Sequence, residues 1–337
     1  MLVGYPTRTE WIESYNSLGT RNVLKSGLNY FDKLLKSWNI SEKEFFEQAK
    51  KIDEHEVLLI LDRIKNYLEK GLAHKTGKVY FSVITTWFRI NGMRLDDKII
   101  QKRIRWNKPL KEMKQIPDRA TIQKFIDISP LKYKVFFYMA IATGARQSEI
   151  LGLKVKDIDF RQKVPTVHFE AINTKTKQER YSFLTPEASE ILQRYIEGKS
   201  FDSKIFTIHR ISLQKHFDRC RERLGLVDRY TTRTHKISIH RLRAYTKREL
   251  SKAVGDDMAH VILGHAEGLA TYDADNLEGM MLDYEKAIPG LTIGIHAKDK
   301  ARMTNQEEKI KLMAQEIELL KRKINHNDDE PNELEDK

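Results

Sequence analysis

Apolar residues recur at every third or fourth position along most of this chain, and this spacing restricts it to a largely helical fold. Between residues 21 and 91 the spacing marks about four helices. Ser41 and Glu44 stand in the order of a capping box at the start of one of them. Neither an acid–base cluster nor a glycine-rich loop occurs there. We therefore expect residues 1–100 to form a helical N-terminal domain that serves for binding.

The helical spacing changes to an alternating one at a single place, residues 164–184. Val167 and Phe169 precede a polar turn that carries lysines, and Tyr181 and Phe183 follow it. Alternation on both sides of a polar turn is typical of two paired strands. Helical patterns resume after this hairpin, from Pro186 onward and then at residues 211–224, 238–250 and 256–263. The predicted fold is therefore mainly α with a small β-sheet, an α+β arrangement.

A basic segment separates the helical domain from the second half of the chain. Residues 101–116 carry six Lys and Arg residues, contain Pro109 and lack a helical period. We interpret them as an interdomain linker, which either lies along a phosphate backbone or is simply exposed to solvent. The second domain is then expected at residues 117–297.

The end of the chain shows two further patterns. Residues 298–326 contain apolar residues at steps of three and four, separated by Glu, Lys and Arg: Ile310, Met313, Ile317, Leu320 and Ile324. This short heptad pattern predicts a coiled-coil-like helix that either pairs with a second copy or packs on its own chain. Residues 327–337 are mostly acidic, and we expect a disordered tail there.

Positive charge exceeds negative charge and is unevenly distributed. The chain has 60 Lys and Arg against 48 Asp and Glu, a net charge of +12. Residues 210–252 hold thirteen of the basic residues and four acidic ones. Segregated charge of this kind indicates a polyanionic partner, but basicity alone selects no activity.

Composition excludes several other classes. Cys220 is the only cysteine, so the chain forms no internal disulfide and holds no zinc cluster of thiolates. The longest apolar stretch, residues 135–142, is much shorter than the roughly 18 residues that cross a bilayer. The N-terminus lacks the apolar core of a signal peptide. We therefore expect a protein of a reducing intracellular compartment that makes no contact with a membrane.

Four short motifs follow one another in the second domain. They are A-R-Q-S-E-I at residues 145–150, H-R-L-R at 240–243, L-G-H at 263–265 and, shortly afterwards, Tyr272. Each residue alone is ordinary, but the ordered set resembles the tyrosine recombinase (phage integrase) family over residues 117–293. The resemblance implies a tyrosine recombinase catalytic domain at 117–297, preceded by a core-binding domain at 1–100.

The resemblance also assigns roles to individual residues. The catalytic set it implies is Arg146, Lys175, His240, Arg243, His265 and Tyr272, with Glu149 supporting Arg146 from one helical turn later. Lys175 is the match when K-T-K-Q-E-R at 175–180 is aligned on its Glu-Arg pair with the lysine hairpin of the family, and Lys177 is the alternative. His240 and Arg243 are three positions apart, so they share a helix face and can reach one ligand.

The nucleophile is the one departure from the family pattern. The family's tyrosine stands somewhat further from the last histidine than Tyr272, which follows His265 by seven residues, and Tyr284 follows it by nineteen. We prefer Tyr272 because Leu277 and Met281 give the segment around Tyr284 the spacing of a packed helix. The shortened pattern resembles the integrases of archaeal chromosomes, viruses and plasmids.

These residue types suit phosphodiester transfer that needs neither a metal nor another cofactor. Two guanidiniums neutralise nonbridging phosphoryl oxygens at any working pH. The ammonium of Lys175 is expected to protonate the leaving 5′ oxygen, His240 to act as acid or base, and His265 to hydrogen-bond the phosphate. Tyr272 would form a 3′-phosphotyrosine that retains the bond energy, so that resealing requires no ATP.

The predicted function is therefore that of a site-specific DNA recombinase, an integrase that integrates or excises a mobile element. Its expected partners are double-stranded DNA and further copies of the chain, a dimer on each site and a tetramer in synapsis. The expected location is the cytoplasm of a prokaryote, at the nucleoid. The alternatives are Xer-type resolution of chromosome dimers, a type IB topoisomerase, and a non-cleaving dimeric DNA-binding protein of the same fold.

Overall fold

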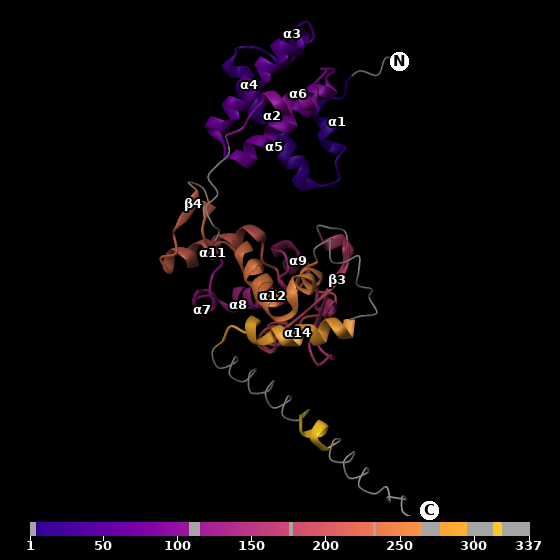
Figure 1. Cartoon of the computed structure of the whole chain (residues 1–337), viewed down its shortest axis with the longest axis vertical. Coiled ribbons are helices and arrows are strands. Elements are labelled where there is room, and N and C mark those ends of the chain that lie inside the picture. Colours follow the sequence, from indigo (N-terminus) through magenta and orange to yellow (C-terminus); the bar gives the residue numbers. More distant parts are fainter. Residues whose placement is uncertain are drawn as a thin grey trace, which may run out of the picture. The chain divides into compact units, whose positions relative to one another are not determined.

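The computed structural model describes residues 5–107, 115–174, 178–231, 234–264, 277–294 and 313–318. The chain divides into two compact units, Met1–Lys111 and Glu112–Lys337, here called the N-terminal and the C-terminal unit (Figure 1). The expectation of a mainly helical fold with a small sheet is confirmed. No described helix combines the length and the hydropathy of a membrane span.

The described part of the N-terminal unit is helical throughout. Its helices are α1 (Arg8–Glu13), α2 (Leu18–Ser37), α3 (Glu42–Ala49), α4 (Glu54–Gly71), α5 (His74–Ile90) and α6 (Asp97–Arg103). The predicted capping box of Ser41 and Glu44 opens α3. Helices α4 and α5 both pack on α2, where Phe31, Phe45 and Phe88 meet with ring centroids 5.1–5.3 Å apart. This aromatic cluster holds the unit together.

Helix α6 extends three residues into the segment that the charge run marked as a linker. Ile100 and Ile104 stand one helical turn apart and are both buried, which is why the helix packs here in spite of the basic residues between them. Trp106 also lies against the N-terminal unit, with its ring edge-on to Phe81 at 5.6 Å. Residues 108–114 lie outside the described residues.

The C-terminal unit combines helices with a small antiparallel sheet. The helices are α7 (Arg119–Asp127), α8 (Leu131–Thr143), α9 (Gln147–Gly152), α10 (Pro186–Ile196), α11 (Arg210–Arg223), α12 (His240–Leu263) and α14 (Leu277–Leu291). The sheet has the order β1 (Ile158–Asp159), β2 (Thr166–Phe169) and β3 (Arg180–Phe183). Strands β2 and β3 are the predicted hairpin, whereas β1 and the short pair β4 (Arg229–Thr231) and β5 (Thr234–His235) were not expected from the sequence.

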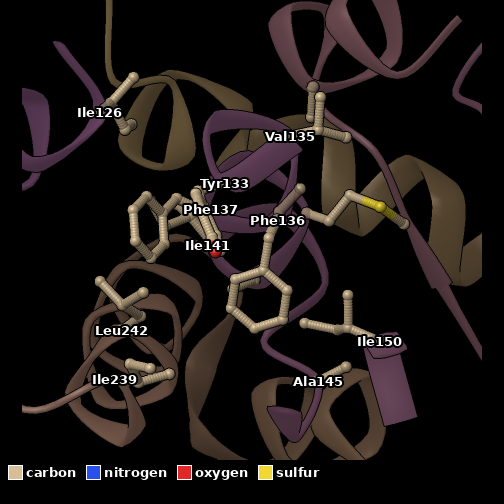
Figure 2. Packing of buried hydrophobic residues seen from close by; sticks show 14 of the residues in the cluster. Ile126, Tyr133, Val135, Phe136, Phe137, Ile141, Ala145, Ile150, Ile239 and Leu242 are labelled. Carbon is tan, nitrogen blue, oxygen red and sulfur yellow. The ribbon is translucent and has the colours of Figure 1, made fainter. Parts of the chain in front are cut away.

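Helix α8 is the centre of this unit. Nine of its thirteen residues are buried, so it is enclosed on all sides rather than along one stripe. Figure 2 shows Phe136 of α8 within one cluster that also includes Ala145, Ile150, Ile239 and Leu242. These last four residues flank Arg146 and Glu149 on one side and His240 and Arg243 on the other. The core therefore fixes the two motifs that carry the candidate arginines.

Helix α12 contains the break that the sequence predicts between two helical segments. Gly255 has non-helical torsion angles, φ 84° and ψ 166°, inside the continuous assignment. The chain turns back there, so that Arg243 near the start of α12 reaches the carbonyl of Leu263 at its end. A residue with a side chain would be strained at this positive φ.

The end of α14 is held by three other helices. Arg119 of α7 donates to the carbonyls of Pro289 and Gly290, and Tyr245 of α12 also donates to Gly290. Glu187 of α10 accepts from the backbone N–H groups of Ile293 and Gly294. These contacts therefore fix the position of the backbone at residues 289–294.

The expected heptad helix at 298–326 is described only in part. Residues 313–318 are helical and exposed, with Met313 and Ile317 at 61% and 53% exposure. The other seam positions and the acidic tail lie outside the described residues. Pairing through this helix remains a prediction.

Gly144 provides a test of how tightly the end of α8 packs against α12. It ends α8 with φ 58°, and a Cβ atom there would lie 2.2 Å from Leu263 Cδ2 and 3.1 Å from Thr246 Cγ2. Gly225 has a similar φ of 68° but nothing within 4 Å of its Cβ position. We expect Gly225→Ala to cost about 1 kcal/mol, the strain of the left-handed backbone. Gly144→Ala should cost about 1–3 kcal/mol more from overpacking.

The measurement is urea unfolding followed by two signals. The chain has four Trp residues, Trp11, Trp38, Trp87 and Trp106, all in the N-terminal unit, so their fluorescence reports that unit alone. Circular dichroism reports both units. The fluorescence transition should be the same in both variants, and only the remaining transition should move. Equal costs for the two substitutions would contradict the close packing at Gly144.

Candidate active site

Arg146 lies in the link between α8 and α9 and is bound at two points to Glu149. Its backbone N–H donates to Glu149 Oε2 at 3.0 Å, which is half of a capping box at the start of α9. Its Nη1 donates to Glu149 Oε1 at 2.8 Å. The Arg146 side chain is 26% exposed and that of Glu149 only 1%. The carboxylate is therefore a buried support, and the guanidinium faces solvent in part.

Arg180, which sequence reasoning did not assign to the site, is the second partner of Glu149. Its Nη2 lies 3.0 Å from Glu149 Oε2, and its Nη1 donates to the carbonyl of Ile262 in the last turn of α12. The guanidinium lies over the ring of Phe169, its cross-strand neighbour, at 4.1 Å. Its side chain is 3% exposed. Arg180 thus links the hairpin, α9 and the end of α12.

Arg243 connects the first motif to the third. Its Nη1 donates to the carbonyl of Gly144 at 2.5 Å and its Nη2 to that of Leu263 at 2.8 Å. These bonds occupy two of the five N–H groups of a guanidinium. Burial, together with the neighbouring charges of Arg180 and Arg146, lowers the pKa of Arg243 to about 10. The group nevertheless stays protonated at neutral pH.

The three arginines and the one carboxylate leave an excess of two positive charges, 3 − 1 = 2, in a largely buried cluster. We call Arg146, Glu149, Arg180 and Arg243 the arginine cluster. Its composition repels cations and attracts an anion with at least two oxygens, since guanidiniums form paired hydrogen bonds with such groups. A phosphodiester has this chemistry.

The remaining members of the predicted set are only partly described. His240 is the first residue of α12 and is exposed, one helical turn before Arg243. Lys175 and Lys177 lie outside the described residues, but Thr174 Oγ1 donates to the carbonyl of Gln178 at 2.8 Å, which brings the two ends of their segment together.

His265 and Tyr272 also lie outside the described residues. Gly264, immediately before His265, ends α12 with φ 70°. A Cβ atom on Gly264 would lie 2.2 Å from Arg180 Cδ, so the chain enters the third motif against the arginine cluster.

Tyr284, the alternative nucleophile, is a core residue. It is fully buried, and its hydroxyl donates to the carbonyl of Ala142 at 2.9 Å. Burial raises the pKa of this hydroxyl well above its ordinary value, and the charge of Glu187 acts in the same direction. A phenol that is enclosed, hydrogen-bonded and difficult to ionise is a poor nucleophile.

The class that this fold and cluster define agrees with comparisons to known proteins. Residues 110–273, slightly less than half of the chain, match the phage integrase family. It is similar to the tyrosine recombinase XerA of Saccharolobus solfataricus, with 32% identity over 117 residues. That match covers 34% of this chain and 38% of the relative, so the chain is matched to well under half of the relative's length.

The chain is also similar to solved structures. The XerH site-specific recombinase bound to palindromic difH substrate, in a post-cleavage complex, has a TM-score of 0.50 and 19% identity, over 79% of this chain and 80% of that one. A lambda integrase (75–356) dimer bound to a COC′ core site has a TM-score of 0.49 and 19% identity, over 74% and 97%. At this identity the XerH likeness shows the fold alone.

Glu149 provides a pH test of the arginine cluster. Burial opposes its ionisation, but Arg180 and Arg146 outweigh burial and lower its pKa. The stability that this carboxylate contributes is therefore present above its ordinary, unfolded pKa and lost as pH falls through the lowered one. Glu149→Gln should destabilise the C-terminal unit at neutral pH, and the destabilisation should shrink in acid. Urea transitions by circular dichroism between pH 7 and pH 3 measure it.

Glu187→Gln is the matched control, since Glu187 is a partly buried carboxylate whose pKa is shifted in the opposite direction. Burial raises its pKa, against the hydrogen bonds from Ile293 and Gly294. The stability linked to its protonation is present below the unfolded pKa and lost as pH rises through the raised one. The effect of Glu187→Gln should therefore grow as pH falls. The same pH trend in both variants would contradict the charge pairing of Glu149.

Proposed function

We propose that this protein is a site-specific DNA recombinase that cleaves and rejoins strands through a 3′-phosphotyrosine, and that it integrates or excises a mobile element in a prokaryotic cell. The observation that carries the proposal is the arginine cluster. Arg146 and Arg243 come from motifs about a hundred residues apart, yet Arg243 binds the carbonyl of Gly144, two residues before Arg146. The match of residues 110–273 to the phage integrase family supports the same reaction.

The scissile phosphate binds with its two nonbridging oxygens toward Arg146 and Arg243. Both guanidiniums are fixed before the substrate arrives, so they stabilise the charge that develops at phosphorus with little reorganisation. The Oη atom of Tyr272 attacks phosphorus, the bond from phosphorus to the 5′ oxygen breaks, and the tyrosine becomes linked to the 3′ phosphate. The reverse attack by a 5′ hydroxyl of another strand reseals the DNA.

Two proton transfers accompany this exchange. The Oη proton of Tyr272 passes to His240, which is exposed at the start of α12 and one turn from Arg243. The leaving 5′ oxygen takes a proton from the ammonium of Lys175 on the hairpin, and Lys177 is the alternative donor. His265 donates a hydrogen bond to the phosphate. Every charge and proton in the scheme is supplied by a protein side chain, so the reaction includes no metal or cofactor.

The basic surface and the domain order support binding of double-stranded DNA. The N-terminal unit is proposed to be the core-binding domain at 1–100, followed by the linker at 101–116 and the catalytic domain at 117–297. Helix α11, strands β4 and β5 and the first half of helix α12 carry most of the basic run of residues 210–252. Backbone phosphates are the natural partners of such a surface. Two copies are proposed on each site and four in synapsis, with the heptad helix at 298–326 as one contact.

Three alternatives lead to different products. A Xer-type resolvase joins two identical sites, whereas an integrase joins the end of an element to a different host sequence. A type IB topoisomerase relaxes supercoils and exchanges no partners. A non-cleaving DNA-binding protein forms no covalent bond. The fixed geometry of Arg146 and Arg243 disfavours the last alternative, because binding alone does not require two arginines to be held in fixed positions for one phosphate.

The experiment that tests the function uses DNA from both sides of the gene. The purified protein is incubated with a plasmid that carries this DNA, and the protein is then denatured. Covalent protein–DNA complexes are captured, their ends mapped, and the recombinant junctions sequenced. Junctions between unlike sequences support an integrase, and junctions between identical sites support a Xer-type role. Absence of any covalent complex would overturn the proposal.

Tyr272→Phe should abolish covalent attachment and leave DNA binding unchanged, because it removes only the nucleophilic oxygen. The substrate is a duplex with the mapped site and a nick beside it, so that the cleaved complex accumulates, and a denaturing gel detects it. Tyr284→Phe is the matched control. It removes the bond to the Ala142 carbonyl, so it should lower stability by about 1 kcal/mol and still give the covalent complex. The reverse result would make Tyr284 the nucleophile.

Lys175→Ala should slow cleavage of ordinary DNA and be largely rescued when sulfur replaces the leaving 5′ oxygen. A thiolate leaves without a proton, so the general acid is no longer needed. Rates of covalent complex formation on the two substrates give the comparison, with Lys177→Ala measured in parallel. Rescue of Lys177→Ala alone would transfer the role to Lys177. A Lys175→Ala defect that is equal on both substrates would remove Lys175 from this step.

A further inference from the structure

We propose that Arg180 is a positioning residue for the cleavage reaction, one that orients the guanidinium of Arg146 through the carboxylate of Glu149. This inference rests on the proposed function, since it names a further residue that the same site requires. Arg180 itself is closed to a ligand, because its side chain is only 3% exposed. It therefore acts through its neighbours and makes no contact with the phosphate.

The carboxylate of Glu149 accepts three hydrogen bonds, and each bond restricts its rotation further. Oε1 accepts from Arg146 Nη1, while Oε2 accepts from the backbone N–H of Arg146 and from Arg180 Nη2. Without Arg180, Oε2 would keep only the backbone bond, and the carboxylate could rotate about its last torsion angle. Rotation would carry Oε1, and with it the guanidinium of Arg146, away from its place.

Arg180 is itself held by contacts that another cationic side chain cannot reproduce in full. One nitrogen binds Glu149 and another binds the carbonyl of Ile262, and the plane of the group rests on Phe169. Lysine has one charged nitrogen and no planar face, so it cannot place separate nitrogens on Glu149 and Ile262 or rest a flat group on Phe169. The packing is close: a Cβ on Gly264 would lie 2.6 Å from Arg180 Nε.

The same contacts connect the parts of the site to one another. Arg180 begins strand β3, two residues after Gln178, which directly follows Lys177. Its bond to Ile262 and its contact with Gly264 fix the backbone from which His265 continues. A single buried guanidinium thus sets the relative places of the first motif, the hairpin and the third motif.

The test measures cleavage on substrates that lack one phosphate charge. A methylphosphonate at the scissile position replaces one nonbridging oxygen by a neutral methyl group and exists as two diastereomers. The guanidinium that faces the methyl group is no longer needed, so each diastereomer should relieve the loss of one arginine. We expect Arg146→Ala and Arg243→Ala to be relieved by opposite diastereomers. Single-turnover formation of the covalent complex gives the rates.

Arg180→Met keeps an unbranched side chain that reaches about as far as Nε, and removes the guanidinium with its charge and hydrogen bonds. On ordinary DNA it should slow cleavage by about 10²-fold, the cost of a misplaced catalytic group, with DNA affinity changed by less than about twofold. On methylphosphonates it should follow Arg146→Ala and be relieved by the same diastereomer. Arg180→Lys should recover a small part of the rate on ordinary DNA.

Arg119→Met is the control for a loss of stability. Arg119 supports the end of α14 through Pro289 and Gly290 and has no contact with Glu149 in the described part of the chain. It should lower the midpoint of unfolding and affect both diastereomers alike. If Arg180→Met also affects both alike, Arg180 is only structural and the inference is wrong. If Arg180→Met fails to fold, Arg180→Lys is compared on the two diastereomers in its place.

The results distinguish a failure of the role of Arg180 from a failure of the proposed recombinase activity. If the unaltered protein forms no covalent complex with any substrate, the proposed recombinase activity fails. If the unaltered protein cleaves and Arg180→Met cleaves at the same rate, the recombinase stands and only the role of Arg180 falls.

Discussion

The rest of the site depends on one interaction, the pairing of the Glu149 carboxylate with Arg146 and Arg180. It is 1% exposed, and an isolated ion at that depth would be far too costly to maintain. Arg180 and Arg146 compensate for this cost, and they lower its pKa although burial alone would raise it. The same bonds also compensate for the burial of Arg180. Neither charged side chain could be buried alone, so removal of one would leave the other as an unpaired charge in the interior.

The core of the C-terminal unit converts this local pairing into a fixed geometry. Helix α8 is buried on all sides, and its neighbours Ala145, Ile150, Ile239 and Leu242 stand directly beside the site residues in sequence (Figure 2). A packed interior resists small displacements, because each shift opens a void or creates a clash. The backbones of Arg146 and Arg243 are therefore held by apolar packing, and only the side-chain ends are left to hydrogen bonds.

Helices and the hairpin were predictable from the sequence, because their apolar spacing repeats over many residues. The break at Gly255 and the burial of Tyr284 followed from the same spacing. The role of Arg180 was not predictable, since an arginine in a strand looks the same whether it faces solvent or a buried carboxylate 31 residues earlier. The available signal was its position in the strand, two residues from Ser182 and therefore on the same, buried face.

Helix boundaries also depend on contacts that are distant in sequence. Helix α6 continues into the basic run because Ile104 packs in the N-terminal core, which a count of charges does not reveal.

The excess positive charge of the arginine cluster has a consequence for stability. Two uncompensated charges in a largely buried place repel one another, and burial together with this repulsion lowers the pKa of Arg243. Binding of a phosphate would supply the missing negative charge, so the free protein holds its arginines in a less stable arrangement than the complex does. That arrangement favours the transition state in particular, because the charge on the phosphoryl oxygens is greatest there. The instability of the empty cluster and the catalysis proposed for it thus have the same physical origin.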